Sequence, residues 1–531
     1  MKRSEELNKL TQVQEWDFII IGGGASGLGS ALDATSRGFK TLLLESHDFA
    51  KATSSRSTKL VHGGVRYLAQ GDVGLVKEAL KERGLLAKNA AHIVKNQSFI
   101  IPNYTWWGGI YYKIGLSIYD FLAGKLSLGK TQYINKAKTI EKLPTIEQKN
   151  LASGVVYQDG QFDDARLAIN LGQTIIEKGG SAINYLKVIN LLKNDSNKIT
   201  GVVAEDQFSK KQYEIRGKVV INATGVFTNE ILNMNNPKHG KFVVPSQGIH
   251  LVLDKSFLKS DEAIMIPKTS DGRVLFVVPW HDRALVGTTD TLLDDPSFEP
   301  HALESEIEFV LNTARQYLSK KPTREDVKSV FAGLRPLAAP KDEGKNTKEV
   351  SRSHKVITSD TGLVSIIGGK WTTYRKMAED TIDKAIQIHK LPSTPTKTER
   401  LSIHGNIKPE EVDRSNHLYV YGSDIPAIKN LQSSNPEYSK KIHPDHPFTV
   451  AEIIWAIRHE MAETVEDILA RRVRLLFLDA RAAIDSAHKV AAIIAEERQL
   501  PQEWAQEQEK EFIELAKGYL LTPYSPNTNL N

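Results

Sequence analysis

The chain has 531 residues, long enough for roughly two to four domains with large cores. With 40% hydrophobic and 25% charged residues it has an ordinary globular composition, and a formal net charge of +5 over this length does not indicate a nucleic-acid partner. The absence of cysteine excludes disulfides, thiolate metal sites, iron–sulfur clusters and a cysteine nucleophile. We predict no metal site.

The N-terminal segment MKRSEELNKLTQVQEW alternates charged and apolar residues and has no continuous apolar core, so it does not resemble a secretory signal. The longest charge-free stretch lies between Lys95 and Lys113; it contains Pro102 and is too short to span a bilayer. We therefore expect no transmembrane helix and a cytoplasmic protein.

Residues 18–45 run through an apolar segment, a G-x-G-x-x-G cluster, a helix of small residues, a second apolar segment and an acid. This order predicts a strand–turn–helix–strand unit that holds a dinucleotide. The glycines allow the sharp turn, the approach of a pyrophosphate and close helix packing, the helix N-terminus attracts phosphate, and the acid accepts the ribose hydroxyls. The candidate contacts are Gly22, Gly24, Ala25, Ser26, Gly27 and Glu45.

Two later segments extend this prediction. A strand at Val219–Ile221, preceded by meander strands near 183–192 and 201–204, ends in Ala223, Thr224 and Gly225, where backbone comes close to a cofactor. In SIIGGKWTTYRK a strand is followed by Gly368, Gly369 and a helix, and such a helix start suits the N1–C2=O edge of a reduced flavin. Because an NAD enzyme generally needs only the first unit, three segments favour FAD.

The C-terminal part is predicted to be helical. Thr449 and Glu452 form the pattern of a capping box, and we expect one helix through AEIIWAIRHEMAETVEDILARR, residues 451–472. The HEMAE sequence in it is no zinc motif, because Glu463 stands where a second histidine is needed. His459 and Glu460 are expected on a helix surface or between domains. The arginines at 471, 472 and 474 are expected on a solvated or interdomain face, with contact to acidic lipid as the alternative.

Six segments of the chain form a recognisable set: ATSSRSTKLVHGGVRYL (52–68), YQDGQFDDARL, VPW, GTTD, AGLRPL and GGKWTTYRK. Together they resemble the FAD-dependent glycerol-3-phosphate dehydrogenases of the bacterial respiratory type. The match runs from about residue 16 to 390, and a helical C-terminal part follows. The resemblance implies a fold of class α/β plus α+β: a Rossmann-like FAD-binding domain of the glutathione-reductase/D-amino-acid-oxidase type, a β-sheet substrate domain and an α-helical C-terminal cap domain.

We expect these domains to be interleaved along the chain. The FAD-binding domain takes residues 1–90, 150–240 and 355–390, the substrate-binding domain takes 91–149 and 241–354, a linker takes 391–410 and the helical domain takes 411–531. The linker is assigned from its content of Pro, Ser, Thr and charge.

The resemblance also implies a substrate, sn-glycerol 3-phosphate, whose oxidation needs cations for the phosphate, a base for the hydroxyl proton and a flavin N5 above the C2 hydrogen. Arg335 precedes Pro336, which favours a fixed loop, and His250 could titrate near neutral pH and act as the base, although a hydrogen-bonded core histidine is the default in its apolar stretch. The expected catalytic residues are His250, Arg335 and Lys370, and the expected substrate contacts are Arg66, Tyr67, Arg335, Arg352 and Lys370.

The mechanistic hypothesis is hydride transfer from C2 to flavin N5 while the hydroxyl proton leaves to His250 or to a water. Binding of FAD is expected to be non-covalent, and His62 is not assigned to a covalent link. The remaining expected cofactor contacts are Ser54, Ser55, Ser57 and Thr372, together with Gly368, Gly369 and Lys370; the serines alternatively cap the following segment.

In the resembled dehydrogenases the electrons go to a membrane quinone, which implies peripheral attachment to the inner face of the cytoplasmic membrane. The aromatic segment NYTWWGGIYYKIGLSIYDFLAG, residues 103–124, suits a membrane interface, but a buried helix that roofs the active site is the favoured interpretation. The oligomeric state stays open, a homodimer included.

Two other functions are alternatives. A glycerol-3-phosphate oxidase shares these motifs and passes electrons to oxygen with peroxide formation; the dehydrogenase is favoured because no inserted block stands out between the motifs. A flavoprotein that acts on RNA is disfavoured by the nearly balanced charge and the absence of cysteine.

Overall fold

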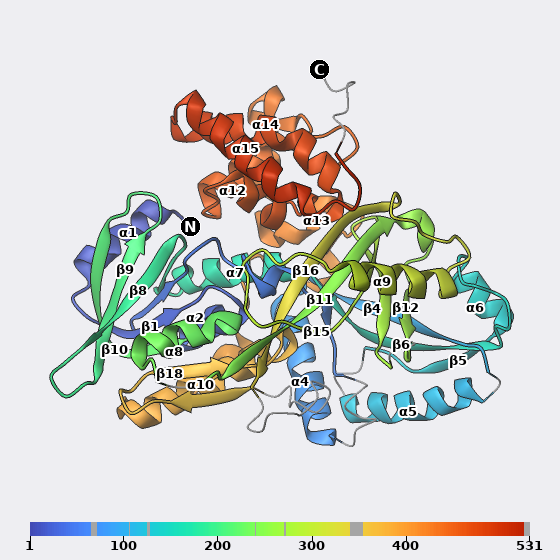
Figure 1. Ribbon diagram of the computed structural model, residues 1–531, viewed down its shortest axis with the longest axis horizontal. Helices are drawn as coiled ribbons and strands as arrows, with labels where there is room; N and C mark the ends of the chain where they lie inside the picture. The colour runs from blue at the N-terminus through green and yellow to red at the C-terminus, as the bar shows by residue number, and fades with distance from the viewer. Residues whose placement is uncertain are drawn as a thin grey trace.

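The computed structural model describes residues 1–64, 72–105, 107–124, 128–238, 240–269, 272–339 and 354–524. Two β-sheets lie side by side, and a cluster of C-terminal helices covers their junction on one side (Figure 1). The fold agrees with the class expected from the sequence. The expected boundaries of the domains remain a prediction.

The first sheet is built around a parallel core. Strand β1 pairs in parallel with β2 and β10, and β10 pairs in parallel with β18. The sequence of β1, WDFIII, is almost continuously apolar because helices cover the sheet. The described strands, in the order of the sheet, are β17 (Lys355–Thr358), β18 (Val364–Ile367), β10 (Gln212–Asn222), β1 (Trp16–Ile21), β2 (Thr41–Leu44) and β7 (Ser181–Ile183), with β8 (Leu186–Lys193) and β9 (Ile199–Asp206) as an antiparallel extension.

Helices follow the strands as the glycine pattern predicts. Helix α2 begins directly after the glycine turn and packs against α7 and α10, and its buried face joins β1 in one hydrophobic core. The helices of this part are α1 (Arg3–Gln12), α2 (Ala25–Arg37), α4 (Val73–Asn89), α7 (Asp164–Glu177), α8 (Thr228–Asn235) and α10 (Tyr374–His389).

The second sheet is mostly antiparallel, and its two longest strands, β11 and β16, pair along nearly their whole length. Its described strands are β3 (Leu60–Val61), β4 (Val94–Asn103), β5 (Gln132–Asn135), β6 (Ser153–Phe162), β11 (Val243–Asp254), β12 (Ala263–Ile266), β13 (Leu275–Trp280), β14 (Arg283–Gly287), β15 (Thr291–Leu292) and β16 (Val327–Ala338). Strands β3 and β6 pair here although the expected boundaries assign them to the FAD-binding domain. Helices α5 (Gly108–Ala123), α6 (Lys136–Lys142) and α9 (Glu304–Tyr317) flank this sheet.

The C-terminal helices share a hydrophobic core with the second sheet. They are α11 (Ile425–Ser434), α12 (Val450–His459), α13 (Leu475–Leu478), α14 (Ala480–Arg498) and α15 (Gln502–Lys517), with a π-helical turn at Asp467–Arg472. The capping box of Thr449 and Glu452 at the start of α12 is confirmed.

The expectation of one helix through residues 451–472 is wrong. Helix α12 ends at His459, and Met461 adopts a left-handed conformation with φ 54°. The following Glu463 and Thr464 donate their backbone N–H groups to the Asp467 carboxylate, which starts a new turn. The apolar periodicity continues through the break, so the sequence pattern alone did not reveal it.

The aromatic helix α5 is not a buried helix as expected. Its inner face is anchored by the buried Leu116 and Tyr119, whose hydroxyl donates to Asp159 at 2.8 Å. Its outer face is exposed, to 60% at Ile114 and 84% at Phe121. Among the described residues, no helix is both long and apolar enough to cross a bilayer.

Candidate functional site

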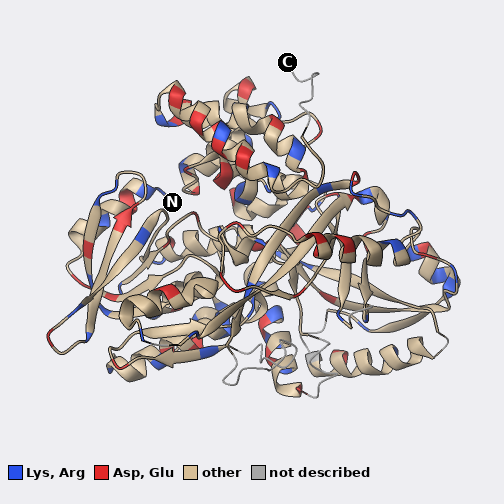
Figure 2. Ribbon diagram, viewed as in Figure 1, with Lys and Arg blue, Asp and Glu red and all other residues tan. Residues whose placement is uncertain are grey.

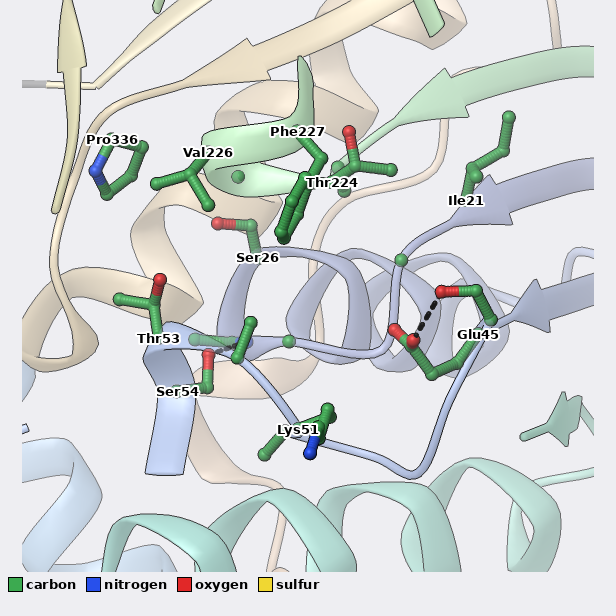
Figure 3. Close-up of a pocket in the computed structure, with 18 of the residues that line it drawn as sticks. Ile21, Ser26, Glu45, Lys51, Thr53, Ser54, Thr224, Val226, Phe227 and Pro336 are labelled. Carbon is green, nitrogen blue, oxygen red and sulfur yellow. Dashed lines mark hydrogen bonds between the residues drawn. The ribbon is translucent and has the colours of Figure 1, made fainter. Parts of the chain in front are cut away.

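A cavity opens at the carboxyl ends of the first sheet's parallel strands, the usual place for ligands in such sheets. Its wall comes from the three segments that the sequence singled out and from the loop after Glu45. Figure 3 labels side chains of the first two segments and of this loop. The expected cofactor contacts that line the cavity are Gly22, Gly24, Ala25, Ser26, Glu45, Ser54, Ala223, Thr224, Gly225, Gly368, Gly369 and Lys370.

The glycine cluster makes the first wall possible. Gly22 has φ +112°, and a β-carbon there would stand 2.7 Å from the Ala223 carbonyl oxygen. A β-carbon at Gly27 would stand 1.8 Å from the Gly22 oxygen, so Gly27 serves the packing and does not line the cavity. Gly24 is the N-cap of α2 and has no side chain of its own over the start of that helix. This wall therefore presents backbone N–H groups at a helix start, as a pyrophosphate requires.

Glu45 follows β2 and closes the far end of the cavity (Figure 3). One carboxylate oxygen accepts from Gly23 N at 2.5 Å and the other from His47 N at 2.8 Å. Burial raises the pKa of Glu45, against the opposing effect of these two hydrogen bonds. The carboxylate is thus held in one orientation beside the glycine turn, where a ribose of a bound dinucleotide would lie.

The loop after Glu45 supplies one further wall. Ser54 Oγ accepts from Ala25 N at 2.9 Å, which ties the loop to the start of α2. Thr53 Oγ1 donates to the Leu334 carbonyl at 2.6 Å, which ties it to β16. Ser55 and Ser57 do not line the cavity, and Ser57 instead donates both N–H and hydroxyl to Asp164.

The third segment closes the opposite end. Gly368 and Gly369 have φ values of 75° and 85°, so the turn after β18 is accessible mainly to glycine. Lys370 follows as the N-cap of a short 3₁₀ turn, and Trp371 Nε1 donates to the Ser54 carbonyl at 2.8 Å. Thr372 does not line the cavity; its hydroxyl accepts from His62 N at 3.2 Å.

His250 lies on β11, opposite Phe331 of β16 and Gly287 of β14. Its ring is buried and stacks on Phe331, with Nε2 2.9 Å from Thr58 Oγ1 and with Nδ1 lacking a hydrogen-bond partner among the described residues. Burial lowers the pKa of His250 well below 6.5, and the cations of Lys59 and Arg335 lower it further. The imidazole is therefore neutral near pH 7.

Arg335 and Pro336 lie within β16, so the expectation of a fixed loop there is wrong, and β16 pairs with β11, the strand that carries His250. The Arg335 guanidinium donates to the Thr289 carbonyl at 3.0 Å and lies 3.3 Å from both Asp290 Oδ1 and Thr288 Oγ1. The next residue, Pro336, lines the cavity, although Arg335 and His250 themselves do not. The two expected catalytic residues thus lie on paired strands of the second sheet, outside the cavity lining, and Lys370 lies on the cavity wall.

Two glycines that the sequence did not single out make room for these side chains. A β-carbon at Gly248 would stand 2.5 Å from Arg335 Nη2, and one at Gly287 would stand 2.4 Å from His250 Cδ2. A glycine inside a strand is a signal of a close approach, but the sequence does not say which side chain approaches. Three expected substrate contacts, Arg66, Tyr67 and Arg352, lie outside the described residues.

The fold and the cavity define a FAD-dependent oxidoreductase. Residues 17–375 match the family model described as FAD dependent oxidoreductase, and residues 359–508 match the one described as the C-terminal domain of alpha-glycerophosphate oxidase. The chain belongs to the family of FAD-dependent glycerol-3-phosphate dehydrogenases, as its relatives indicate.

Among these relatives, the mitochondrial glycerol-3-phosphate dehydrogenase of Rattus norvegicus is 36% identical over 98% of this chain and 75% of its own length. That of Schizosaccharomyces pombe is 37% identical over 93% of this chain and 86% of its own length. The solved glycerol-3-phosphate dehydrogenase of Bacillus halodurans, complexed with FAD, superposes with a TM-score of 0.80 at 28% identity and covers 98% of this chain and 99% of its own.

Proposed function

We propose that the protein oxidises sn-glycerol 3-phosphate to dihydroxyacetone phosphate with FAD and passes the electrons to a membrane quinone. The observation that carries the proposal is that an imidazole with a lowered pKa and an arginine lie on the paired strands β11 and β16: His250, and Arg335 one residue before the cavity-lining Pro336. An alcohol oxidation needs both a proton acceptor and a cation for the carbonyl oxygen that develops.

FAD supplies the hydride acceptor, at its N5. Of the chain's own residues, His250 takes the hydroxyl proton of the substrate, directly or through a water. If Nε2 donates its hydrogen to Thr58, Nδ1 carries the lone pair that accepts this proton. Arg335 and Lys370 stabilise the oxygen as its charge changes. On the resemblance alone, Arg66 and Arg352 bind the phosphate and Tyr67 lines the substrate pocket.

The cofactor-binding proposal rests on the cavity wall. The start of α2 with Gly24 at its N-cap receives the pyrophosphate, Glu45 the ribose, and the turn at Gly368 and Gly369 the flavin end. As the resemblance implies, FAD is held by non-covalent contacts.

The exposed face of α5 supports a membrane as the site of electron delivery. Its apolar side chains recur at helical spacing on one side, and the helix carries few charges (Figure 2). The apolar side chains of this exposed face are Trp107, Ile110, Tyr111, Ile114, Ile118 and Phe121. Such a continuous apolar face is costly in water and is typical of helices that lie in a membrane interface.

Two features favour lipid over a second copy of the chain as the partner of this face. Trp107 and Tyr111 are side chains that suit the headgroup region, and the exposed lysines 113, 130, 136 and 138 lie on α5 or around the neighbouring β5. Lysines beside an apolar face attract an anionic lipid surface. We therefore propose peripheral binding to the inner face of the cytoplasmic membrane.

Anaerobic mixing of the purified holoprotein with sn-glycerol 3-phosphate tests the substrate. We expect the flavin absorbance near its visible maximum to bleach, whereas glycerol and sn-glycerol 1-phosphate should leave it unchanged. Failure to bleach contradicts the substrate assignment.

One sample of the reduced protein is then mixed with a soluble quinone and a second sample is exposed to air. Fast reoxidation by quinone and slow reoxidation by air is the expected result. Rapid peroxide formation in air would instead assign the chain to the oxidases, which share the C-terminal family model.

A further inference from the structure

The segment Asp467–Arg474, called the arginine segment below, contacts the FAD-binding part rather than solvent. Its three arginines, at 471, 472 and 474, are 2–3% exposed, although their spacing in the sequence suggested a solvated face or a lipid contact. Each pairs with a carboxylate of the FAD-binding part, either Asp48 or Asp164. The lipid alternative for these arginines is therefore wrong.

Asp48 is the first of the two anchor points. Arg472 binds its carboxylate with two nitrogens, Nη1 at 2.7 Å and Nη2 at 2.9 Å, and Arg471 Nε adds a third contact at 2.5 Å. Asp48 is fully buried and follows Glu45 by three residues. Burial by itself would raise the pKa of Asp48, but Arg472 and Arg471 hold it below its usual value, so the carboxylate is charged.

Asp164, the first residue of α7, is the second anchor point, and it contacts the other end of the loop at Ser57 and Lys59. Arg474 Nη2 lies 3.1 Å from Asp164 Oδ1 and donates to the Ser55 carbonyl at 2.9 Å. The other carboxylate oxygen of Asp164 accepts from Lys59 Nζ at 2.6 Å and from the Ser57 hydroxyl at 2.7 Å. Residues 45–59 are thereby fixed at both ends.

The middle of this loop forms a wall of the cavity. Ala50, Lys51, Ala52, Thr53 and Ser54 all line it. Lys51 also pairs at 2.6 Å with Glu466, the residue just before the arginine segment. The C-terminal helical part therefore contacts the loop at its start, middle and end without lining the cavity itself.

We propose that the arginine segment positions loop 45–59 for FAD, so that FAD affinity depends on these arginines although none of them contacts the cofactor. The inference rests on the proposal that FAD occupies the cavity. The physical reason is that a buried charge is strongly unfavourable when it loses its partners. Loss of Arg472 removes two of the three arginine contacts of Asp48 and leaves Arg471 as its remaining arginine partner, and the loop then moves to hydrate the carboxylate.

The test measures FAD release from the full-length holoprotein by the rise in flavin fluorescence after dilution. Arg472→Ala is expected to accelerate release about 10- to 100-fold, the range typical of residues that orient ligand-binding groups. Arg472→Lys should give an intermediate value, because lysine cannot make two parallel bonds to a carboxylate. Unchanged release in Arg472→Ala would overturn the proposal.

Arg458→Ala is the matched control. Arg458 lies in the same C-terminal part and makes a two-nitrogen ion pair with Glu497 at 2.7 and 2.8 Å, but on the surface of that part. Its loss should leave FAD release unchanged. Equal acceleration in Arg458→Ala and Arg472→Ala would show a general loss of stability and contradict the proposal.

A second measurement separates positioning of the loop from global destabilisation. Ser54→Ala removes a loop side chain that lines the cavity. The double variant with Arg472→Ala should accelerate FAD release less than the product of the two single accelerations, because both substitutions act through one loop. Multiplicative effects would oppose the proposal. If Arg472→Ala does not fold, Asp48→Asn and Arg474→Lys take its place with the same expected direction.

Discussion

Gly287 of β14 and His250 of β11 stand opposite each other, and a β-carbon on Gly287 would lie 2.4 Å from Cδ2 of the imidazole. The position of the imidazole therefore depends on the absence of a side chain on the next strand. Gly248 is not directly opposite Arg335, but a β-carbon there would likewise lie 2.5 Å from Arg335 Nη2. The expected catalytic side chains thus occupy space that a β-carbon on Gly287 or Gly248 would take.

Gly287→Ala is expected to displace His250 and to lower kcat about 100-fold, since small misplacements of a catalytic group have effects of that size. FAD should stay bound, because Gly287 does not line the cavity. Steady-state kinetics with a soluble quinone and the flavin-to-protein ratio measure the two effects. Gly74→Ala is the control, because a β-carbon there meets nothing closer than 3.7 Å; a normal kcat in Gly287→Ala would count against His250.

Arg335→Ala is expected to lower kcat by about 10² to 10³, as removal of one donor to a developing charge does, with FAD retained. Arg335→Lys should recover little, because the arginine spans Thr288, Thr289 and Asp290 with a planar fork. Stopped-flow reduction of the flavin measures the chemical step directly. Arg324→Ala, in a surface pair with Glu304, is the control; near-normal flavin reduction in Arg335→Ala would exclude the proposed role.

The pH dependence of kcat tests the state of His250. Burial holds the pKa of this imidazole well below 6.5. At any pH above its pKa the imidazole is neutral and able to accept a proton. We therefore expect no loss of kcat as pH falls from 8 to 6. Saturating substrate is used because a phosphate monoester itself titrates near pH 6. An acid limb near pH 6.5 that His250→Gln lacks would contradict the lowered pKa.

His404 contributes a pH-dependent term to stability. Burial alone would lower the pKa of His404, but its hydrogen bonds to Asp424 at 2.8 Å and Glu177 at 2.5 Å outweigh burial and raise the pKa to about 9. The folded protein therefore binds this proton more tightly than the unfolded chain does. The stabilisation, up to about 3 kcal/mol, is complete below about pH 6.5 and is lost as pH rises through 9.

Thermal unfolding of the wild type and His404→Gln at pH 6 and pH 9.5 measures this term. The variant should have the lower midpoint at pH 6, and the two proteins should converge at pH 9.5. A difference that grows with pH would mean that the ion pairs of His404 do not stabilise the fold.

Substitution of the exposed face of α5 tests membrane contact. Ile114→Ser with Phe121→Ser should weaken binding to phosphatidylglycerol vesicles tenfold or more, because burial of each such side chain is worth about 1.5 to 3 kcal/mol. Activity with a soluble quinone should not change. Flotation of the vesicles measures binding, and Phe208→Ser, which removes an equally apolar exposed side chain elsewhere, is the control. Vesicle binding that survives both serine substitutions would exclude α5 as the contact.

The parts of the site that follow from backbone geometry could be predicted from the sequence. Gly22 needs a left-handed φ, Gly27 a close approach of backbone, and Gly368 a turn that other residues avoid. Each requirement is local, so a short motif carries it. The capping box of Thr449 and Glu452 is local for the same reason.

Relationships between distant segments could not be predicted in this way. Arg471 and Asp48 are 423 residues apart, and nothing near either residue distinguishes a buried partner from a surface ion. The faces of α5 are a second example: helical spacing divides Tyr119 from Ile118 and Ile114, but only the packed fold decides which side meets protein. Ser57 likewise faces Asp164 rather than the cavity.

The burial of the arginine segment also bears on how the molecule unfolds. Its charges are compensated largely by Asp48 and Asp164 in the FAD-binding part, while the helices around it share a hydrophobic core with the second sheet. Separation of the C-terminal helices would expose that core and leave several charges unpaired at once. The described parts are therefore expected to lose structure in one cooperative transition, without a stable fragment that lacks the C-terminal helices.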